Sequence, residues 1–134
     1  MNTQLRLHRL RYVNDAVATA SPARLVCMLY DRLVRDLQMA ELAIVAAEPA
    51  VASENLVHAQ DIVLELQASL DVTKWKGGPG LSSVYTFLHG ELIQANVKKD
   101  AKRVRSCLTL VEPLADAWRQ ASNELLVVSA AQSA

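Results

Sequence analysis

The sequence has little of several features that mark whole classes of protein. Of its 134 residues 4% are aromatic, and there are four glycines, four prolines and two cysteines. Two cysteines cannot make a disulfide scaffold, and Cys27 and Cys107 sit far apart in the sequence, which suits a reducing cytosol. The longest apolar run, 42–47, falls well short of the roughly 18 residues of a membrane span. No apolar stretch follows the N-terminal arginines, so no signal peptide is expected. Secreted, membrane-spanning and fibrous proteins are therefore excluded.

An excess of charge is also missing, since 14 Lys and Arg balance 14 Asp and Glu. A dedicated nucleic-acid binder is normally basic overall, so the balance argues against that class. The charges are unevenly distributed, with seven acids and no Lys or Arg in 36–71 and a basic cluster at 98–105. That cluster could contact phosphate, but a solvated helix start facing acidic neighbours explains it better.

Apolar residues make up 51% of the chain, enough for a core, and they recur with helical spacing. Ser21 followed by Pro22 predicts an N-cap and a first helical turn. The glycines at 77–80 and the proline at Pro49 mark further boundaries. We expect connections near 48–53, 72–80 and 96–100, the last ending at the candidate cap Asp100. The apolar stripes of the four helices are Val26, Tyr30, Leu33, Leu37, Ala40 and Ile44; Leu56, Ala59, Val63, Leu66 and Leu70; Tyr85, Leu88, Leu92 and Ala95; and Val104, Cys107, Val111, Leu114, Trp118 and Leu125.

Four such helices with short connections predict an all-α fold, an antiparallel up-down four-helix bundle. We assign the bundle to residues 21–127, with a short N-terminal arm or helix at 1–20 that caps it and a flexible tail at 128–134. This topology brings the acids of the first two helices to the same end as the basic cluster. Pro113 should kink the last helix because it removes a backbone hydrogen bond. The acids that this topology brings to the basic cluster at 98–105 are Glu41, Glu48, Glu54 and Asp61.

The sequence shows no catalytic, metal or cofactor motif, and we predict that the protein is not an enzyme. His8, His58 and His89 are scattered, and no Glu-x-x-His pair exists for a di-iron site. The glycines at 77–80 lack the Lys and Ser or Thr of a phosphate loop. Both cysteines fall within helical patterns, which favours packed core thiols. A helical protein with abundant apolar surface and no reactive centre usually binds other proteins, often through an amphipathic helix in a groove.

Three blocks of the sequence occur in the same order as in one known protein family. The first runs from Tyr12 to Asp31 and holds Thr-Ala-Ser-Pro followed by Met-Leu-Tyr-Asp. The second spans 54–71, and the third runs from Val84 through Asp100 to Trp118. Together they resemble the flagellar export chaperones of the FliS family over nearly the whole chain.

The resemblance implies a cytosolic chaperone that holds the C-terminal segment of flagellin, prevents its premature polymerisation and delivers it to the export gate of the flagellar secretion apparatus. It also implies that the N-terminal arm covers part of the client surface. No cofactor, nucleic acid or membrane insertion is expected. A helical adaptor or oligomerising bundle that binds a folded partner remains the alternative. The residues that the resemblance implies for the cap and the client groove are Tyr12, Val17, Leu25, Met28, Leu29, Tyr30, Ile62, Leu66 and Tyr85.

Overall fold

The first described helix begins where the sequence predicted it. The computed structural model describes residues 21–74 and 76–133, with side chains as far as Glu124; the predicted arm at 1–20 lies outside these residues. Helix α2 spans Pro22–Val45. The Ser21 side chain accepts a hydrogen bond of 3.2 Å from the backbone N–H of Arg24, and proline occupies the first turn, where its missing N–H removes no helical bond. The N-cap prediction is confirmed.

Three more helices follow: α3 at Pro49–Ser69, α4 at Gly78–Lys98 and α5 at Ala101–Ser133. Helix α3 starts inside the connection predicted over 48–53, because its proline is accommodated in the first turn. The carboxylate of Asp100 accepts a hydrogen bond of 3.2 Å from the N–H of Arg103, as its candidate role as a cap predicts. Helix α5 runs through Pro113 and stays helical beyond the predicted bundle boundary at residue 127.

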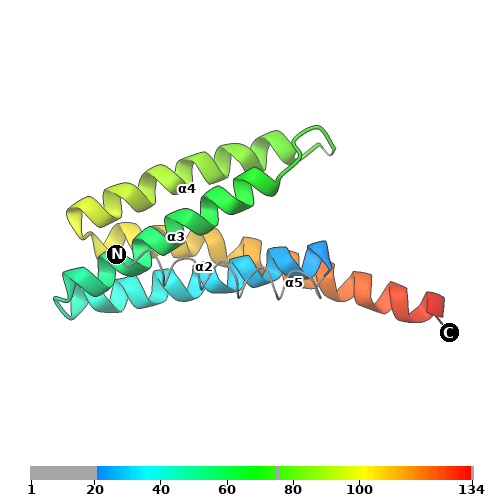
Figure 1. Cartoon of the computed structure of the whole chain (residues 1–134), viewed down its shortest axis with the longest axis horizontal. Coiled ribbons are helices and arrows are strands. Elements are labelled where there is room, and N and C mark those ends of the chain that lie inside the picture. The colour runs from blue at the N-terminus through cyan, green and yellow to red at the C-terminus, as the bar shows by residue number, and fades with distance from the viewer. Residues whose placement is uncertain (1–20, 75, 134) are drawn as a thin grey trace, which may run out of the picture.

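The helices pack as an antiparallel bundle in which α2 lies against both α3 and α5, and α3 lies against α4. Contact between α4 and α5 is less extensive. Figure 1 shows the α3–α4 hairpin close to the other two helices near the turn between α4 and α5, and farther from them at the loop between α3 and α4. The predicted all-α four-helix fold is confirmed, and its two helix pairs diverge toward one end.

The core runs along the bundle and is built from the predicted stripes. Leucines from all four helices are fully buried in it, namely Leu33, Leu37, Leu56, Leu88, Leu92 and Leu108. Cys27 and Cys107 are buried free thiols, which confirms their predicted place in the core. Burial raises the pKa of the Cys107 thiol to about 11, because a thiolate loses hydration in an apolar surrounding.

The end of the bundle near the α4–α5 turn carries the predicted contact between acids and the basic cluster. The guanidinium of Arg105 donates to both carboxylate oxygens of Glu41, with the Nε–Oε2 bond at 2.9 Å. Arg103 donates to Glu91 at 3.1 Å, a partner outside the predicted acidic set. These pairs join α2 and α4 to the start of α5, although partly exposed pairs of this kind contribute little stability each.

One buried carboxylate was not expected from the sequence. Asp36, on α2, is only 1% exposed. Its Oδ2 contacts Nδ1 of His58 on α3, and its Oδ1 lies 3.2 Å from Nε of Arg32, one turn earlier on α2. A buried charge needs partners to offset its lost hydration. The contact therefore ties α2 to α3 in one register.

Candidate binding site

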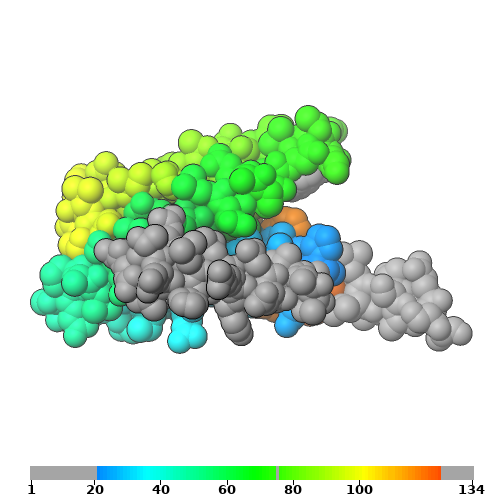
Figure 2. Space-filling model, in the orientation of Figure 1, coloured from blue at the N-terminus to red at the C-terminus, as the bar shows by residue number. Residues whose placement is uncertain are grey.

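An apolar pocket of about 280 Å³ opens where the two helix pairs diverge. It takes residues from α2, α3, α4, α5 and the loop between α3 and α4. In Figure 2 the surface is hollowed between the loop end of α3 and α4, in green, and the start of α2, in blue. The lining residues are Val26, Leu66, Ser69, Leu70, Asp71, Lys74, Tyr85 and Trp118. Apolar side chains from the helices and polar side chains from the loop therefore meet in one cavity.

Two tyrosines lie beneath this pocket and join α2 to α4. The hydroxyls of Tyr30 and Tyr85 are 2.7 Å apart in a buried hydrogen bond. Burial raises the pKa of both tyrosines, most strongly that of Tyr30, where the bond to Tyr85 adds to the effect. Paired hydroxyls can be buried at little cost. The hydrogen bond therefore ties α2 to α4 beside the pocket.

The structure brings some of the predicted site residues to this pocket and leaves others elsewhere. Leu66 and Tyr85 line it, and Tyr30 is attached through its hydrogen bond. Leu25 and Met28 are half-buried near the start of α2. Leu29 and Ile62 belong to the core cluster. Tyr12 and Val17 lie outside the described residues.

Sequence reasoning missed several lining residues. Trp118 was expected only in the core, and the structure finds it half-buried beside the pocket. Val26 and Leu70 belonged to predicted apolar stripes, but nothing in their spacing marks them as pocket residues. Helical periodicity says which side of a helix faces inward, whereas a gap between helices depends on how they cross.

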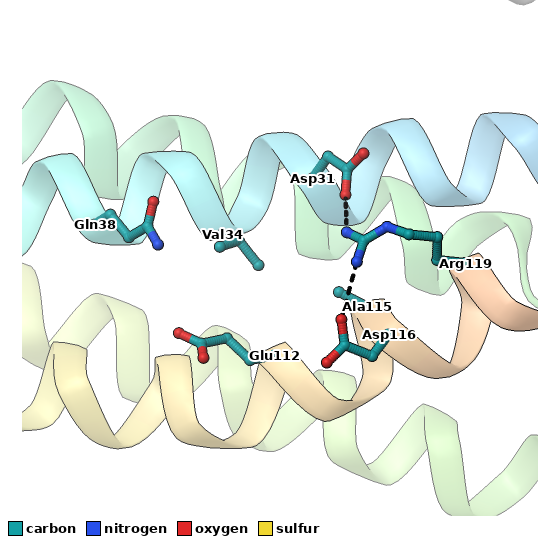
Figure 3. A pocket seen from close by; sticks show the side chains of 7 residues that line it. All are labelled: Asp31, Val34, Gln38, Glu112, Ala115, Asp116 and Arg119. Carbon is teal, nitrogen blue, oxygen red and sulfur yellow. Dashed lines mark hydrogen bonds and ion pairs between the residues drawn. The ribbon is translucent and has the colours of Figure 1, made fainter.

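A second hollow of about 280 Å³ lies between α2 and α5 and has a different character. Its polar residues dominate Figure 3, where the guanidinium of Arg119 lies between two carboxylates. Arg119 donates to Asp31 at 2.8 Å and to Asp116 at 2.9 Å. Glu112 and Gln38 complete the polar lining. Arg119, Asp31 and Asp116 already pair with one another at an exposed surface, so the apolar pocket is the better candidate for binding a partner.

The described residues contain no cluster of three or more His, Cys, Asp or Glu side chains that could hold a metal ion. None of the described helices is long and apolar enough to cross a membrane. A helical bundle with an apolar pocket between its helices has the architecture of a helical protein-binding module. That is the class that the fold and the site define.

The comparisons with known proteins narrow this class to one family. Residues 5–125 match the model of the flagellar protein FliS family, and the chain belongs to that family. It is 34% identical over 114 residues to the flagellar secretion chaperone FliS of Salmonella typhimurium, covering 82% of this chain and 83% of the relative. It is 31% identical over 110 residues to the same chaperone of Bacillus subtilis, covering 82% of each chain.

A solved structure described as a flagellar chaperone from bacteria shares the fold. Its TM-score is 0.71 at 18% identity, over 89% of this chain and 98% of that one. The FliS family is a family of flagellar secretion chaperones and not of enzymes. The chaperone class predicted from the sequence is confirmed.

Proposed function

We propose that the protein is an export chaperone that holds the C-terminal segment of flagellin in the cytosol, prevents its premature polymerisation and delivers it to the export gate of the flagellar secretion apparatus. The observation that carries the proposal is the family match over residues 5–125. A filament subunit that assembles through amphipathic helices can aggregate before export, so its apolar faces need cover.

The apolar pocket supports this proposal physically. Its volume of about 280 Å³ is at the lower limit of cavities that enclose small-molecule ligands and suits side chains of a client helix. Leu66, Leu70 and Trp118 supply apolar contact, at roughly 25 cal/mol per Å² of buried apolar area. A client that orders as it binds gives part of this free energy back. Affinity then stays moderate, and release needs no covalent chemistry.

Calorimetry with a peptide of the last forty or so residues of flagellin tests the proposal, since a segment of that length can order on binding. We expect binding with a strongly negative heat-capacity change and a gain of helicity in the complex. An adaptor for folded partners would not bind the peptide. The absence of binding would therefore refute the proposal that flagellin is the client.

The site itself is tested with two valines on α2. Val26 lines the apolar pocket, whereas Val34 lines the polar hollow beside Arg119, and both are half-buried. We expect Val26→Ser to weaken peptide binding by about tenfold, the equivalent of about 1.4 kcal/mol. Val34→Ser is the matched control and should bind as the unchanged protein does. Equal affinities of the two variants for the peptide would show that the client does not bind in the apolar pocket.

A further inference from the structure

One charged side chain of the apolar pocket has no hydrogen-bond partner among the described residues. Lys74 lines the pocket from the loop between α3 and α4, and its side chain is 80% exposed. Its Nζ lies 3.9 Å from Oδ2 of Asp71, which is longer than a hydrogen bond. The ammonium group is therefore held only loosely at the edge of an apolar cavity.

Three other polar side chains of the lining are already bonded within the protein. Ser69 donates a hydrogen bond of 3.0 Å to a backbone carbonyl one turn earlier on α3, and the hydroxyl of Tyr85 is bonded to that of Tyr30. The Oδ1 atom of Asp71 accepts hydrogen bonds of 3.0 and 2.6 Å from the N–H and the hydroxyl of Thr73. These two bonds lower the pKa of Asp71 and fix its carboxylate against the loop. The ammonium group, in contrast, can turn toward a ligand.

The charge of the loop and the walls of the pocket favour one kind of ligand. Residues 71–76 contain two lysines and one aspartate, and both lysines are exposed. A negative group that approaches this loop is therefore attracted overall. The helices contribute apolar walls, among them Val26, Leu70 and Trp118, which attract an apolar group. The combination is complementary to a ligand that carries an apolar part and a negative charge close together.

We propose that the client enters the apolar pocket with a large apolar side chain and presents, one helical turn away on the same face, a carboxylate that pairs with Lys74. The pairing rests on the proposed function and defines which pattern of side chains the client must carry. Residues three or four apart on a helix lie on one face, so a single client helix can present both groups. The pair lies at the exposed rim, where a charge acts mainly on the association rate and on its salt dependence.

Charge reversal at Lys74 tests the pairing on the peptide of the last forty or so residues of flagellin. The peptide is amidated at its C-terminus, so that all its carboxylates belong to side chains. We expect Lys74→Glu to raise the dissociation constant about fivefold at low salt, and the difference should shrink as salt is added. Lys76→Glu is the matched control, because Lys76 is exposed on the same loop but is not among the residues that line the pocket. It should have little effect.

A series of peptides separates a direct pairing from a structural effect of the variant. Each Asp or Glu of the peptide is replaced in turn by Lys. One replacement should weaken binding to the native chain and strengthen binding to the Lys74→Glu variant. If no replacement does so, or if Lys74→Glu and Lys76→Glu have equal effects, the pairing is refuted, while binding of the peptide still supports the proposed function.

The neighbouring aspartate distinguishes a client carboxylate from a client cation. Asp71→Asn removes the carboxylate that competes for the ammonium group of Lys74, so it should strengthen binding of the peptide. Weaker binding of this variant would show that the client presents a positive charge to the loop, and it would overturn the proposal.

Two small probes test the pocket independently of flagellin. Anilinonaphthalene sulfonate joins a negative charge to an apolar ring system, and phenylnaphthylamine has the same rings without the charge. With the full chain, Lys74→Gln should lower the affinity for the anionic probe about threefold and leave that for the neutral probe unchanged, and Lys76→Gln should alter neither. Equal effects of the two variants on the anionic probe would overturn the inference. A flagellin peptide that does not bind, with probes that behave as expected, would refute only the proposed client.

Discussion

Removing the buried carboxylate of Asp36 should destabilise the bundle far more than removing an exposed one on the same helix. Asp36 is 1% exposed and is held by His58 on α3 and by Arg32 one turn earlier. Breaking a fully buried ion pair from one side costs about 3–5 kcal/mol. The side chains of His58 and Arg32 are 19% and 41% exposed, so both can turn toward water when the carboxylate is lost. We therefore expect Asp36→Ala to lower the free energy of unfolding by about 2–3 kcal/mol.

The control is Asp31→Ala, five residues earlier on α2. Asp31 pairs with Arg119, but its side chain is 59% exposed, and exposed pairs contribute about 0–1 kcal/mol. Urea denaturation followed by far-ultraviolet circular dichroism measures both variants, with equal slopes as the check that the unfolding transition is comparable. A double-mutant cycle with His58→Ala should give a coupling free energy of about 1 kcal/mol or more. Equal losses for the two aspartates, or no coupling to His58, would refute the assignment of Asp36 as a link between α2 and α3.

Two further predictions concern alkaline pH and the glycines of α4. Burial raises the pKa of Cys107 to about 11 from an ordinary value of 9.0, and it raises that of Tyr30 as well. The folded protein therefore binds these protons more tightly than the unfolded chain. The contribution of the Cys107 thiol to the free energy of unfolding is fully present below pH 9.0 and is lost as the pH rises toward about 11. Denaturation measured over this pH range should show the loss of stability, and Cys107→Ala should make that loss smaller. Gly90→Ala should raise the free energy of unfolding by about 1 kcal/mol, because a Cβ there meets nothing within 4 Å. Gly78→Ala should lower it, because its Cβ would lie 2.8 Å from the Cα of Val72; thermal melts of the two variants that shift in the same direction would contradict this assignment.

The helices and their beginnings were predictable because the signals that set them are local. Ser21 caps α2, and Asp100 caps α5, through hydrogen bonds to residues three positions ahead. The burial of Cys27 and Cys107 followed from the spacing of apolar residues. The pocket was only partly predictable, since Leu66 and Tyr85 were expected near a groove but Trp118 was assigned only to the core.

The sequence by itself determined that this chain forms four amphipathic helices in an antiparallel order and that it belongs among flagellar export chaperones, because periodicity, capping and ordered blocks are properties of the linear chain. Only the tertiary structure decided that the helix pairs diverge at one end and open a pocket there, and that Asp36 lies buried against His58. Both depend on the angles at which helices cross and on which side chains meet. These are contacts between residues far apart in the chain, and no local pattern specifies them.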